Sequence, residues 1–385
     1  MINGGGWFCA ATFDSVGLTL FTPGKNMTQT IFEHGTARRV MYAGVGVVML
    51  MLGTLSEPAC ADEGGVSYWL PGRFSSLSAT PQVPGWSMAE VYYHTTIGGS
   101  GAVAAAREIE IGKIPASANV SLNARLNAQA DLVLLNPTYT FATPVLGGQL
   151  AIGVTSLFGR ASASIDGTLT SAIGPLVTTR TGSVADSITS FGDLYPQATL
   201  KWNAGVHNFM TYVTGDIPVG AYESARLANL GIGHGAIDGG GGYTYFNPAT
   251  GQEFSAVAGF TYNFKNQDTN YQNGIDFHID WGASQFLSKQ VFVGLVGYGY
   301  QQLTDDFGAH PILGGFRSRV LGIGPQIGFL FPVGDMQGYL NLKGYGEFDA
   351  ANRASGWNTW LTFSISPTAP ASTSASAPTR RIATK

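Results

Sequence analysis

Charged residues are scarce in this chain, at 11% of its 385 residues, whereas soluble domains carry about 25%. The formal net charge is −4 at pH 7, and without a basic excess we expect no nucleic-acid partner. Beyond residue 60 no apolar run approaches the roughly 20 residues that each membrane-spanning helix needs. These absences exclude a helical membrane protein and a nucleic-acid-binding protein.

Cysteine is almost absent as well, with only Cys9 and Cys60. The one continuous apolar run, residues 40–55, follows two arginines and precedes Ala59-Cys60-Ala61. A basic stretch, an apolar stretch and an A-x-A site together predict a secretory signal peptide that is cleaved after Ala61. A membrane anchor is the alternative, but the run is short for a span. The mature chain then has no thiol and needs no disulfide in its oxidising compartment. We interpret residues 1–26, which lack signal character, as an over-extended reading frame.

What the sequence does contain is alternation. Between Asn119 and Leu135 apolar residues occupy one parity, and polar residues occupy the other. A period of two places these sets on opposite faces of a strand. The length exceeds the usual 5–6 residues and is typical of a transmembrane barrel strand with one face toward lipid and one toward the lumen. The polar set predicted to line the lumen includes Asn123, Arg125, Asn127, Gln129 and Asp131.

Similar segments recur along the chain and predict an all-β fold, a transmembrane antiparallel up-and-down barrel of about 12 strands over residues 84–366. The predicted strands are 84–96, 118–143, 149–169, 192–203, 206–219, 240–248, 252–266, 274–287, 290–304, 316–332, 336–350 and 355–366. Short and long connections alternate between them. Since tight turns of outer-membrane barrels are periplasmic, we expect both termini in the periplasm of a Gram-negative cell.

Acids and bases share one parity in several later strands, opposite aromatic and aliphatic side chains. A charge facing lipid is costly, so these residues should face a polar lumen. The set predicted to line the lumen or ligand path is Glu253, Lys265, Asp276, His278, Asp280, Asn341, Lys343 and Glu347. The faces of the strands at 206–219 and 290–304 stay unassigned, because both parities carry aromatics.

Residues 62–83 precede the first strand and contain large apolar side chains that would be unusual on a periplasmic surface. This segment is predicted either to enter the lumen as a plug or to form a loose periplasmic cap. Its apolar members are Tyr68, Trp69, Leu70, Phe74 and Leu77. Residues 367–385, rich in Pro, Ala, Ser and Thr, lack the apolar content needed to fold and are predicted to be a disordered tail.

Two stretches resemble a known family. They are the segment from Gly64 to Phe74 (GGVSYWLPGRF) with Pro84-Gly85-Trp86, and the run from Phe260 to Asp306 that includes NQDTNY, DFHID and QQLTDD. Both are similar to the "MetA-pathway of phenol degradation" proteins, also called the SphA family, and the similarity spans about residues 64–365. The resemblance implies an outer-membrane barrel that passes small hydrophobic or aromatic compounds. It implies no established binding residues.

The sequence therefore favours uptake of such compounds without catalysis or a cofactor. The expected partners are outer-membrane lipid and lipopolysaccharide, the small ligand, and the barrel-assembly machinery during biogenesis. A general diffusion porin is the alternative, and a lipid-modifying barrel enzyme is a weaker one, because neither His94 nor His207 has an obvious acid and serine partner.

Two groups of residues raise the question of a metal. Asp276, His278 and Asp280 lie two residues apart on one face, but side chains so spaced diverge, so we interpret them as a lumenal polar network. Loop oxygens of Asp268, Asn270, Asn273, Asp305 and Asp306 suggest a Ca²⁺ site without the EF-hand spacing, and ordinary polar loops are favoured. Two glycine runs, 231–235 and 239–242, lack the strand–helix context of a nucleotide loop and are interpreted as flexible loop.

Overall fold

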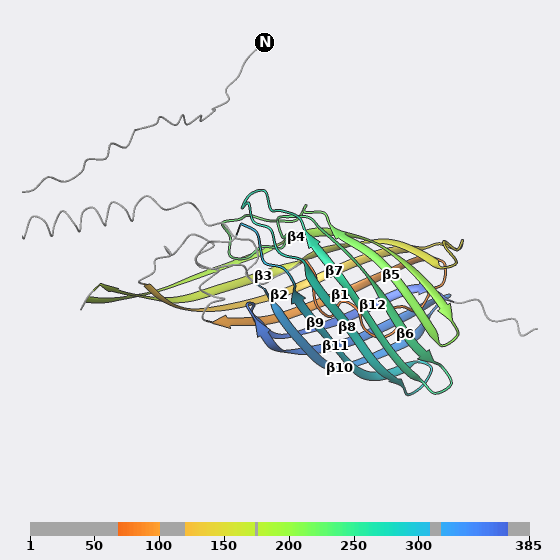
Figure 1. Ribbon diagram of the computed structural model, residues 1–385. Helices are drawn as coiled ribbons and strands as arrows, with labels where there is room; N and C mark the ends of the chain where they lie inside the picture. The colour runs from red at the N-terminus through yellow and green to blue at the C-terminus, as the bar shows by residue number, and fades with distance from the viewer. Residues whose placement is uncertain (1–67, 101–119, 174–175, 309–316, 369–385) are drawn as a thin grey trace, which may run out of the picture. The chain divides into compact units, whose positions relative to one another are not determined.

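Twelve antiparallel strands close into one barrel in the computed structural model, which describes residues 68–100, 120–173, 176–308 and 317–368 (Figure 1). Consecutive strands pair in order, and β1 pairs with β12 to close the wall. The predicted signal peptide, residues 62–67 and the tail beyond residue 368 lie outside the described residues. Within the described residues, no helix is long and apolar enough to span a bilayer. The predicted all-β barrel of twelve strands is confirmed.

The strand boundaries are as follows: β1 Gly85–Ser100, β2 Val120–Thr140, β3 Gln149–Ile173, β4 Leu176–Ala204, β5 His207–Asp216, β6 Ala236–Asn247, β7 Gln252–Asn263, β8 Asp276–Phe286, β9 Val291–Gln302, β10 Arg319–Val333, β11 Met336–Ala351 and β12 Ser355–Pro367. The end of the barrel with the connections 141–148, 205–206, 248–251, 287–290 and 334–335 is called the short-turn end below, and the opposite end is the loop end.

The largest difference from the predicted boundaries concerns residues 170–191, which lie between the predicted strands 149–169 and 192–203. Residues 170–173 and 176–191 belong to β3 and β4, which pair from Gln149 with Lys201 up to Ile173 with Leu176. This hairpin projects beyond the other strands at the loop end (Figure 1). Its outer part is rich in Thr and Ser and shows no apolar–polar dyad, so no period-two signal marks it, although Thr favours strands.

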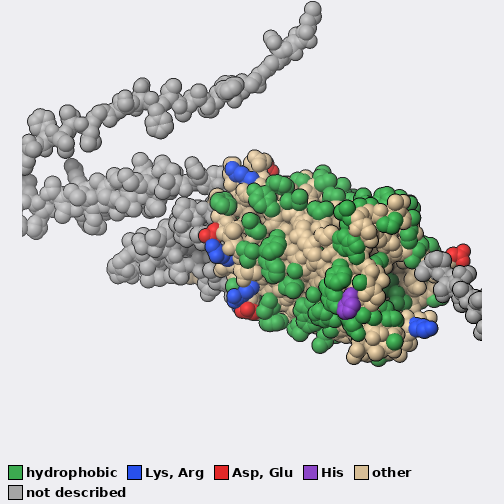
Figure 2. All heavy atoms as spheres, turned by 45° about the vertical axis from the view of Figure 1, so that its right-hand side comes forward, with side chains coloured by type: hydrophobic (Ala, Val, Ile, Leu, Met, Phe, Trp, Pro, Cys, Tyr) green, Lys and Arg blue, Asp and Glu red, His purple; other side chains and the backbone are tan. Residues whose placement is uncertain are grey.

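The wall has an apolar outer face and a largely polar inner face. In β5 exposed and buried residues alternate, with Phe209 and Val213 outside and Met210 and Tyr212 inside, which assigns a strand whose faces were ambiguous. In Figure 2 hydrophobic side chains cover the middle of the wall, and the visible Lys, Arg, Asp and Glu side chains lie toward its two ends. Such a band flanked by polar rims is the lipid-facing surface of an outer-membrane barrel.

The parity predicted for β2 is wrong. Leu126 and Leu132 are buried on the inner face, whereas Asp131 is on the outer face, where it accepts a hydrogen bond from the exposed Tyr92. Outward side chains are apolar from Tyr139 to Val133 and become polar from Asp131 onward. This change marks the rim of the apolar band. The described part of this alternation, residues 125–131, thus lies beyond the band, with its polar face outward and its apolar face toward the lumen.

Glu90 is an acid on the lipid-facing side, because its partners on the two adjacent strands, Leu135 of β2 and Phe363 of β12, are exposed. A carboxylate within the apolar band lowers stability, by less than the 2–4 kcal/mol of a midplane Arg or Lys. We expect Glu90→Leu to raise the free energy of unfolding by up to about 2 kcal/mol, measured by denaturant titration in lipid vesicles. Glu223→Leu, at an exposed loop position, should change it little. An unchanged or lower value for Glu90→Leu would contradict the lipid-facing assignment.

Candidate functional site

The chain immediately before β1 occupies the interior of the barrel. Residues 68–82, called the plug segment below, hydrogen-bond to side chains of β3, β4, β5, β6, β7, β8, β10 and β11. Such contacts require the segment to cross the lumen rather than to cap it from outside.

Asp280 and Lys343 hold the first turn of the plug segment. The Asp280 carboxylate accepts the backbone N–H of Gly72 at 2.9 Å and that of Phe74 at 3.0 Å. The Lys343 ammonium donates to the Gly72 carbonyl at 2.5 Å. Gly72 has φ +92°, and a Cβ there would lie 3.0 Å from the Tyr345 ring, so only glycine fits this turn without strain.

A second group of anchors holds the far half of the plug segment on β6, β7 and β8. The Leu77 N–H donates to Glu253 Oε1 at 2.9 Å, and the Ala79 N–H donates to the Thr244 hydroxyl at 3.0 Å. The hydroxyls of Ser76 and Ser284 lie 2.7 Å apart. Buried polar side chains of the wall therefore hydrogen-bond to backbone groups of the plug segment. A buried chain that lies outside a sheet requires such partners.

Trp69 is the largest buried side chain of the plug segment. Its ring stacks on His278 with centroids 3.6 Å apart and an interplanar angle of 13°. His278 Nε2 lies 2.8 Å from Asp238 Oδ2, and the guanidinium carbon of Arg73 lies 5.6 Å from the centre of the Trp69 ring. Next to it, the Tyr68 hydroxyl is 2.9 Å from that of Thr214, and burial raises the pKa of Tyr68 above its usual value.

On the loop-end side of the plug segment lies a cavity of about 260 Å³. It is enclosed by the plug segment, β1 to β4 and the loop between β5 and β6. Most of its lining is apolar. The apolar lining residues include Leu70, Ile97, Leu126, Ala128, Ala130, Leu132, Leu157, Ala161, Ala163, Leu227, Ala228 and Leu230. The apolar face of β2 thus lines part of this apolar cavity inside the barrel.

Residues 217–235, called the inner loop below, form one side of this cavity. Asp193 of β4 accepts the N–H of Gly220 with one carboxylate oxygen and that of Ile232 with the other, each at 2.7 Å. Arg226 forms a two-point contact with Asp186, at 2.8 and 3.1 Å. Two acids of β4 therefore fix the inner loop over the lumen.

The cavity also has a small polar side at the β11–β12 connection. Glu347, Arg353 and Asn358 contribute to its lining. Glu347 accepts the Tyr298 hydroxyl and the Gly356 N–H, each at 2.8 Å. The guanidinium carbon of Arg353 lies 5.1 Å from the centre of the Tyr300 ring. An apolar chamber with a few convergent polar groups is the usual form of a small-molecule site.

The sequence-predicted lumen residues divide into two groups. Glu253, Asp276, His278, Asp280, Asn341 and Lys343 are buried on the inner face, and Glu347 lines the cavity. Lys265 does not belong with them, because β7 ends at Asn263 and Lys265 is exposed in the following loop.

On β2, Arg125, Asn127 and Gln129 are exposed and share the outward parity of Asp131. Gln129 donates to Asp131 on that face, although the residue also borders the cavity. The side chain of Asn123 lies outside the described part of the chain.

Sequence reasoning missed Arg353, the inner loop and Asp193. Arg353 and the inner loop lie in connections, which carry no period, and Asp193 is a single acid within β4, so no pattern marked them. The flexible-loop interpretation of Gly239 to Gly242 is also wrong, since these residues lie in β6. A Cβ on Gly240 would lie 2.1 Å from the Ala258 carbonyl, so the close approach of β7 explains the glycine.

His94 has an acid partner that the sequence did not reveal. Its Nδ1 lies 2.7 Å from Asp131 Oδ1, and its Nε2 lies 3.3 Å from the Thr96 hydroxyl. This group is on the outer face beside Trp357, whose ring centroid is 4.9 Å from that of His94. Amphipathic rings at the edge of the apolar band are typical of the interfacial girdle.

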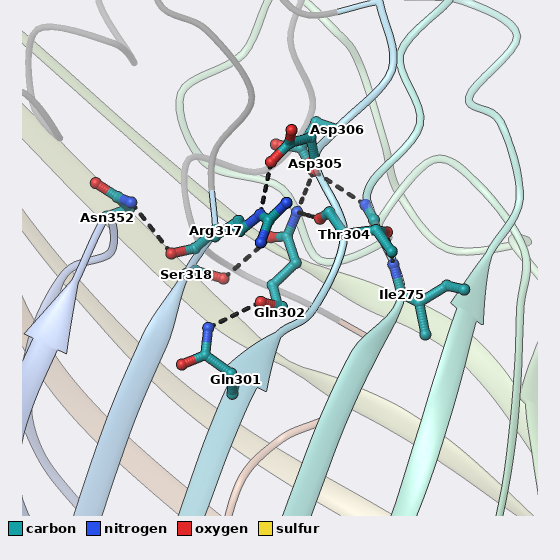
Figure 3. Close-up of polar contacts among 10 residues, drawn as sticks. Ile275, Gln301, Gln302, Thr304, Asp305, Asp306, Arg317, Ser318 and Asn352 are labelled. Atoms are coloured by element: carbon teal, nitrogen blue, oxygen red, sulfur yellow. Dashed lines mark hydrogen bonds and ion pairs between the residues drawn. The ribbon is translucent and has the colours of Figure 1, made fainter.

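The acids of the loop end have protein partners (Figure 3). Asp305 pairs with Arg317 at 2.7 Å, and Asp306 accepts the Gly274 N–H at 3.0 Å and the Gln302 amide at 2.6 Å. Within the described residues, no three His, Cys, Asp or Glu side chains gather where they could hold a metal ion. These carboxylates thus connect β8, β9 and β10 at the loop end.

Comparison with known proteins places this geometry in context. The family described as "Putative MetA-pathway of phenol degradation" matches residues 111–363, more than half of the chain. Among solved structures, the COG4313 outer membrane channel from Pseudomonas putida F1 is similar with a TM-score of 0.54 and 12% identity, over 75% of this chain and 97% of that chain. A Pseudomonas aeruginosa FadL homologue has a TM-score of 0.35 and 9% identity, over 74% and 89%. No curated protein matches the sequence.

Proposed function

Because the chain belongs to the phenol-degradation MetA-pathway family, we propose that this outer-membrane barrel takes up small hydrophobic or aromatic molecules through the cavity above the plug segment. The observation that carries the proposal is the apolar lining of that cavity, inside a wall that also buries acids, amides and bases. A volume of about 260 Å³ lies just below the roughly 300–1,000 Å³ of sites for drug-sized ligands. It suits a single-ring or short-chain molecule.

The proposal places the short-turn end and both termini in the periplasm, as is usual for such barrels. The cavity, which lies between the plug segment and the loop end, then receives ligand from outside the cell. In this orientation the polar outward face of β2, Arg125 to Asp131, lies at the level of the lipopolysaccharide head groups. Insertion would require the barrel-assembly machinery, as for other outer-membrane barrels.

Filling the cavity should block uptake. Ala130 lines the chamber, and Ala130→Trp places an indole in a space of about 260 Å³. We expect a deletion strain that carries this variant to lose growth on aromatic or short aliphatic carbon sources at limiting concentration. The wild-type gene should restore that growth.

The matched control is Val133→Trp, three residues along the same strand. Val133 faces outward and pairs with the exposed Tyr92 and Phe158, so a larger apolar side chain there should leave uptake unchanged. If Ala130→Trp supports growth as well as Val133→Trp does on every substrate that needs the gene, the cavity is not the path.

Two rival functions receive less support from the geometry. A general diffusion porin needs an open lumen, whereas the plug segment crosses this one. A lipid-modifying enzyme would need a nucleophile within about 2.6–3.2 Å of its base. The Thr96 hydroxyl is 3.3 Å from His94, and the Asp131 oxygen that contacts His94 is shared with Tyr92. That arrangement favours an interfacial hydrogen-bond group.

A further inference from the structure

Arg353 lies in the cavity wall with unused hydrogen-bonding capacity. Its Nε and Nη1 atoms are buried and have no acceptor within the described part of the chain. Arg353 belongs to the connection between β11 and β12 and lines the cavity beside Ala354. A guanidinium stays charged at all physiological pH values, and a buried charged donor without an acceptor is costly. Such a group calls for an explanation.

The other charged group of the cavity does not supply that acceptor. Both oxygens of Glu347 are already engaged, by the Tyr298 hydroxyl and by the Gly356 N–H. Among the described residues no carboxylate forms an ion pair with Arg353. The remaining titratable groups of the lining are tyrosine hydroxyls, which are neutral at pH 7. The cavity therefore offers one cation whose partner must come from elsewhere.

Tyr300 holds the guanidinium in place. The ring lies 5.1 Å from Arg353 Cζ, within cation–π range, and the Tyr300 hydroxyl donates to Asp276 at 2.8 Å. Stacking on the ring covers a face of the guanidinium and not its edges, and the Nη1–Nη2 edge presents two parallel donors of the kind that match a carboxylate. The rest of the cavity lining is mostly apolar and includes Leu126 and Ala128.

We propose that Arg353 binds the carboxylate of a small amphiphilic ligand whose aromatic ring or short alkyl chain occupies the apolar part of the cavity. This inference rests on the proposed function and narrows it, from hydrophobic molecules in general to single-ring or short-chain carboxylates. Neutral analogues enter the same chamber but offer the guanidinium neither a negative charge nor a pair of acceptor oxygens. The site thus selects between two ligands of equal shape.

Paired titrations test this selection. The purified full chain in detergent is titrated with benzoate and with benzamide, its neutral isostere, and tryptophan fluorescence reports binding, since Trp69 also lines the cavity. We expect benzoate to bind at least about tenfold more tightly, as for a hydrogen bond to a charged group. In Arg353→Gln the two affinities should become equal, with benzamide unaffected. Arg353→Lys keeps the positive charge but not the parallel donors of the guanidinium. It should retain part of the preference for benzoate over benzamide.

Arg317→Gln is the control, because Arg317 pairs with Asp305 at the exposed loop end. It should leave both affinities unchanged. Equal binding of benzoate and benzamide by the wild type, or a preference that survives Arg353→Gln, would overturn the role of Arg353. Failure of the proposed function looks different, since benzamide would then bind Ala130→Trp as well as it binds the wild type. Failure of both ligands to bind the wild type would overturn both proposals.

Discussion

Deleting residues 68–82 is expected to open the lumen and raise single-channel conductance in planar bilayers several-fold. The segment crosses the interior from β4, where Arg73 bonds Gln197, to β8 and β11, where Gly72 is held. Its removal leaves a twelve-stranded wall whose inner face carries acids, amides and the buried Lys343, all of which water and ions would solvate. Ion flow should therefore replace the present obstruction.

The deletion variant must first be shown to be folded, by the heat-dependent gel migration and the strand signal in circular dichroism that intact barrels give. The barrel wall keeps all of its strand pairs in this variant, including the β1–β12 closure. If the folded variant conducts no more than the full chain, residues 68–82 do not obstruct the path. A large, unselective conductance in the unmodified protein would instead favour the porin alternative.

Asp280→Ala should release the plug segment from the wall. The substitution leaves the N–H groups of Gly72 and Phe74 without their acceptor, and each buried unsatisfied donor costs about 1–3 kcal/mol. We expect the free energy of unfolding to fall by about 2–6 kcal/mol, or the plug segment to leave its place at that cost. In the second case Arg73 becomes exposed, so trypsin should cleave after it in folded vesicle-embedded protein.

Asp349→Ala is the comparison variant. Asp349 is likewise an acid with protein partners, but it pairs with Arg319 and both side chains are about half exposed, and such surface pairs contribute about 0–1 kcal/mol. It should unfold like the wild type and resist trypsin at Arg73. Equal trypsin resistance together with equal free energies of unfolding of Asp280→Ala and Asp349→Ala would show that Asp280 does not anchor the plug segment.

The barrel itself was predictable from sequence because the strands that cross the bilayer must alternate. In β8, Asp276, His278 and Asp280 could only face inward, since the opposite parity is aromatic and aliphatic. The same logic failed for β2, because a period of two shows that the faces differ but not which is inside. Leu126 and Leu132 would suit lipid equally well. They lie on the inner face because the alternating part of β2 extends past the apolar band.

The candidate site was less predictable than the fold. Its parts come from the plug segment, β1 to β4, the inner loop and the β11–β12 connection, which only barrel closure brings together. Trp69 could be singled out as an apolar side chain in need of burial, but nothing in the sequence indicated that it stacks on His278. Arg353 lies in the connection between two strands, where the sequence has no period. Its interest as a binding residue comes from its Nε and Nη1 atoms, which have no acceptor among the described residues.

The plug segment forms one side of the apolar cavity and also hydrogen-bonds to strands all around the barrel. A molecule that leaves the cavity toward the short-turn end must therefore break internal ties, at a net cost of about 0.5–1.5 kcal/mol for each typical hydrogen bond. Breaking all of them at once would make transit very slow. The rate of transit is then set by the hydrogen bonds of the plug segment that break most easily. A ligand whose own polar group can replace Asp280 or Lys343 in those hydrogen bonds passes faster than an inert hydrocarbon of the same size, so throughput and tightness of binding need not rank ligands in the same order.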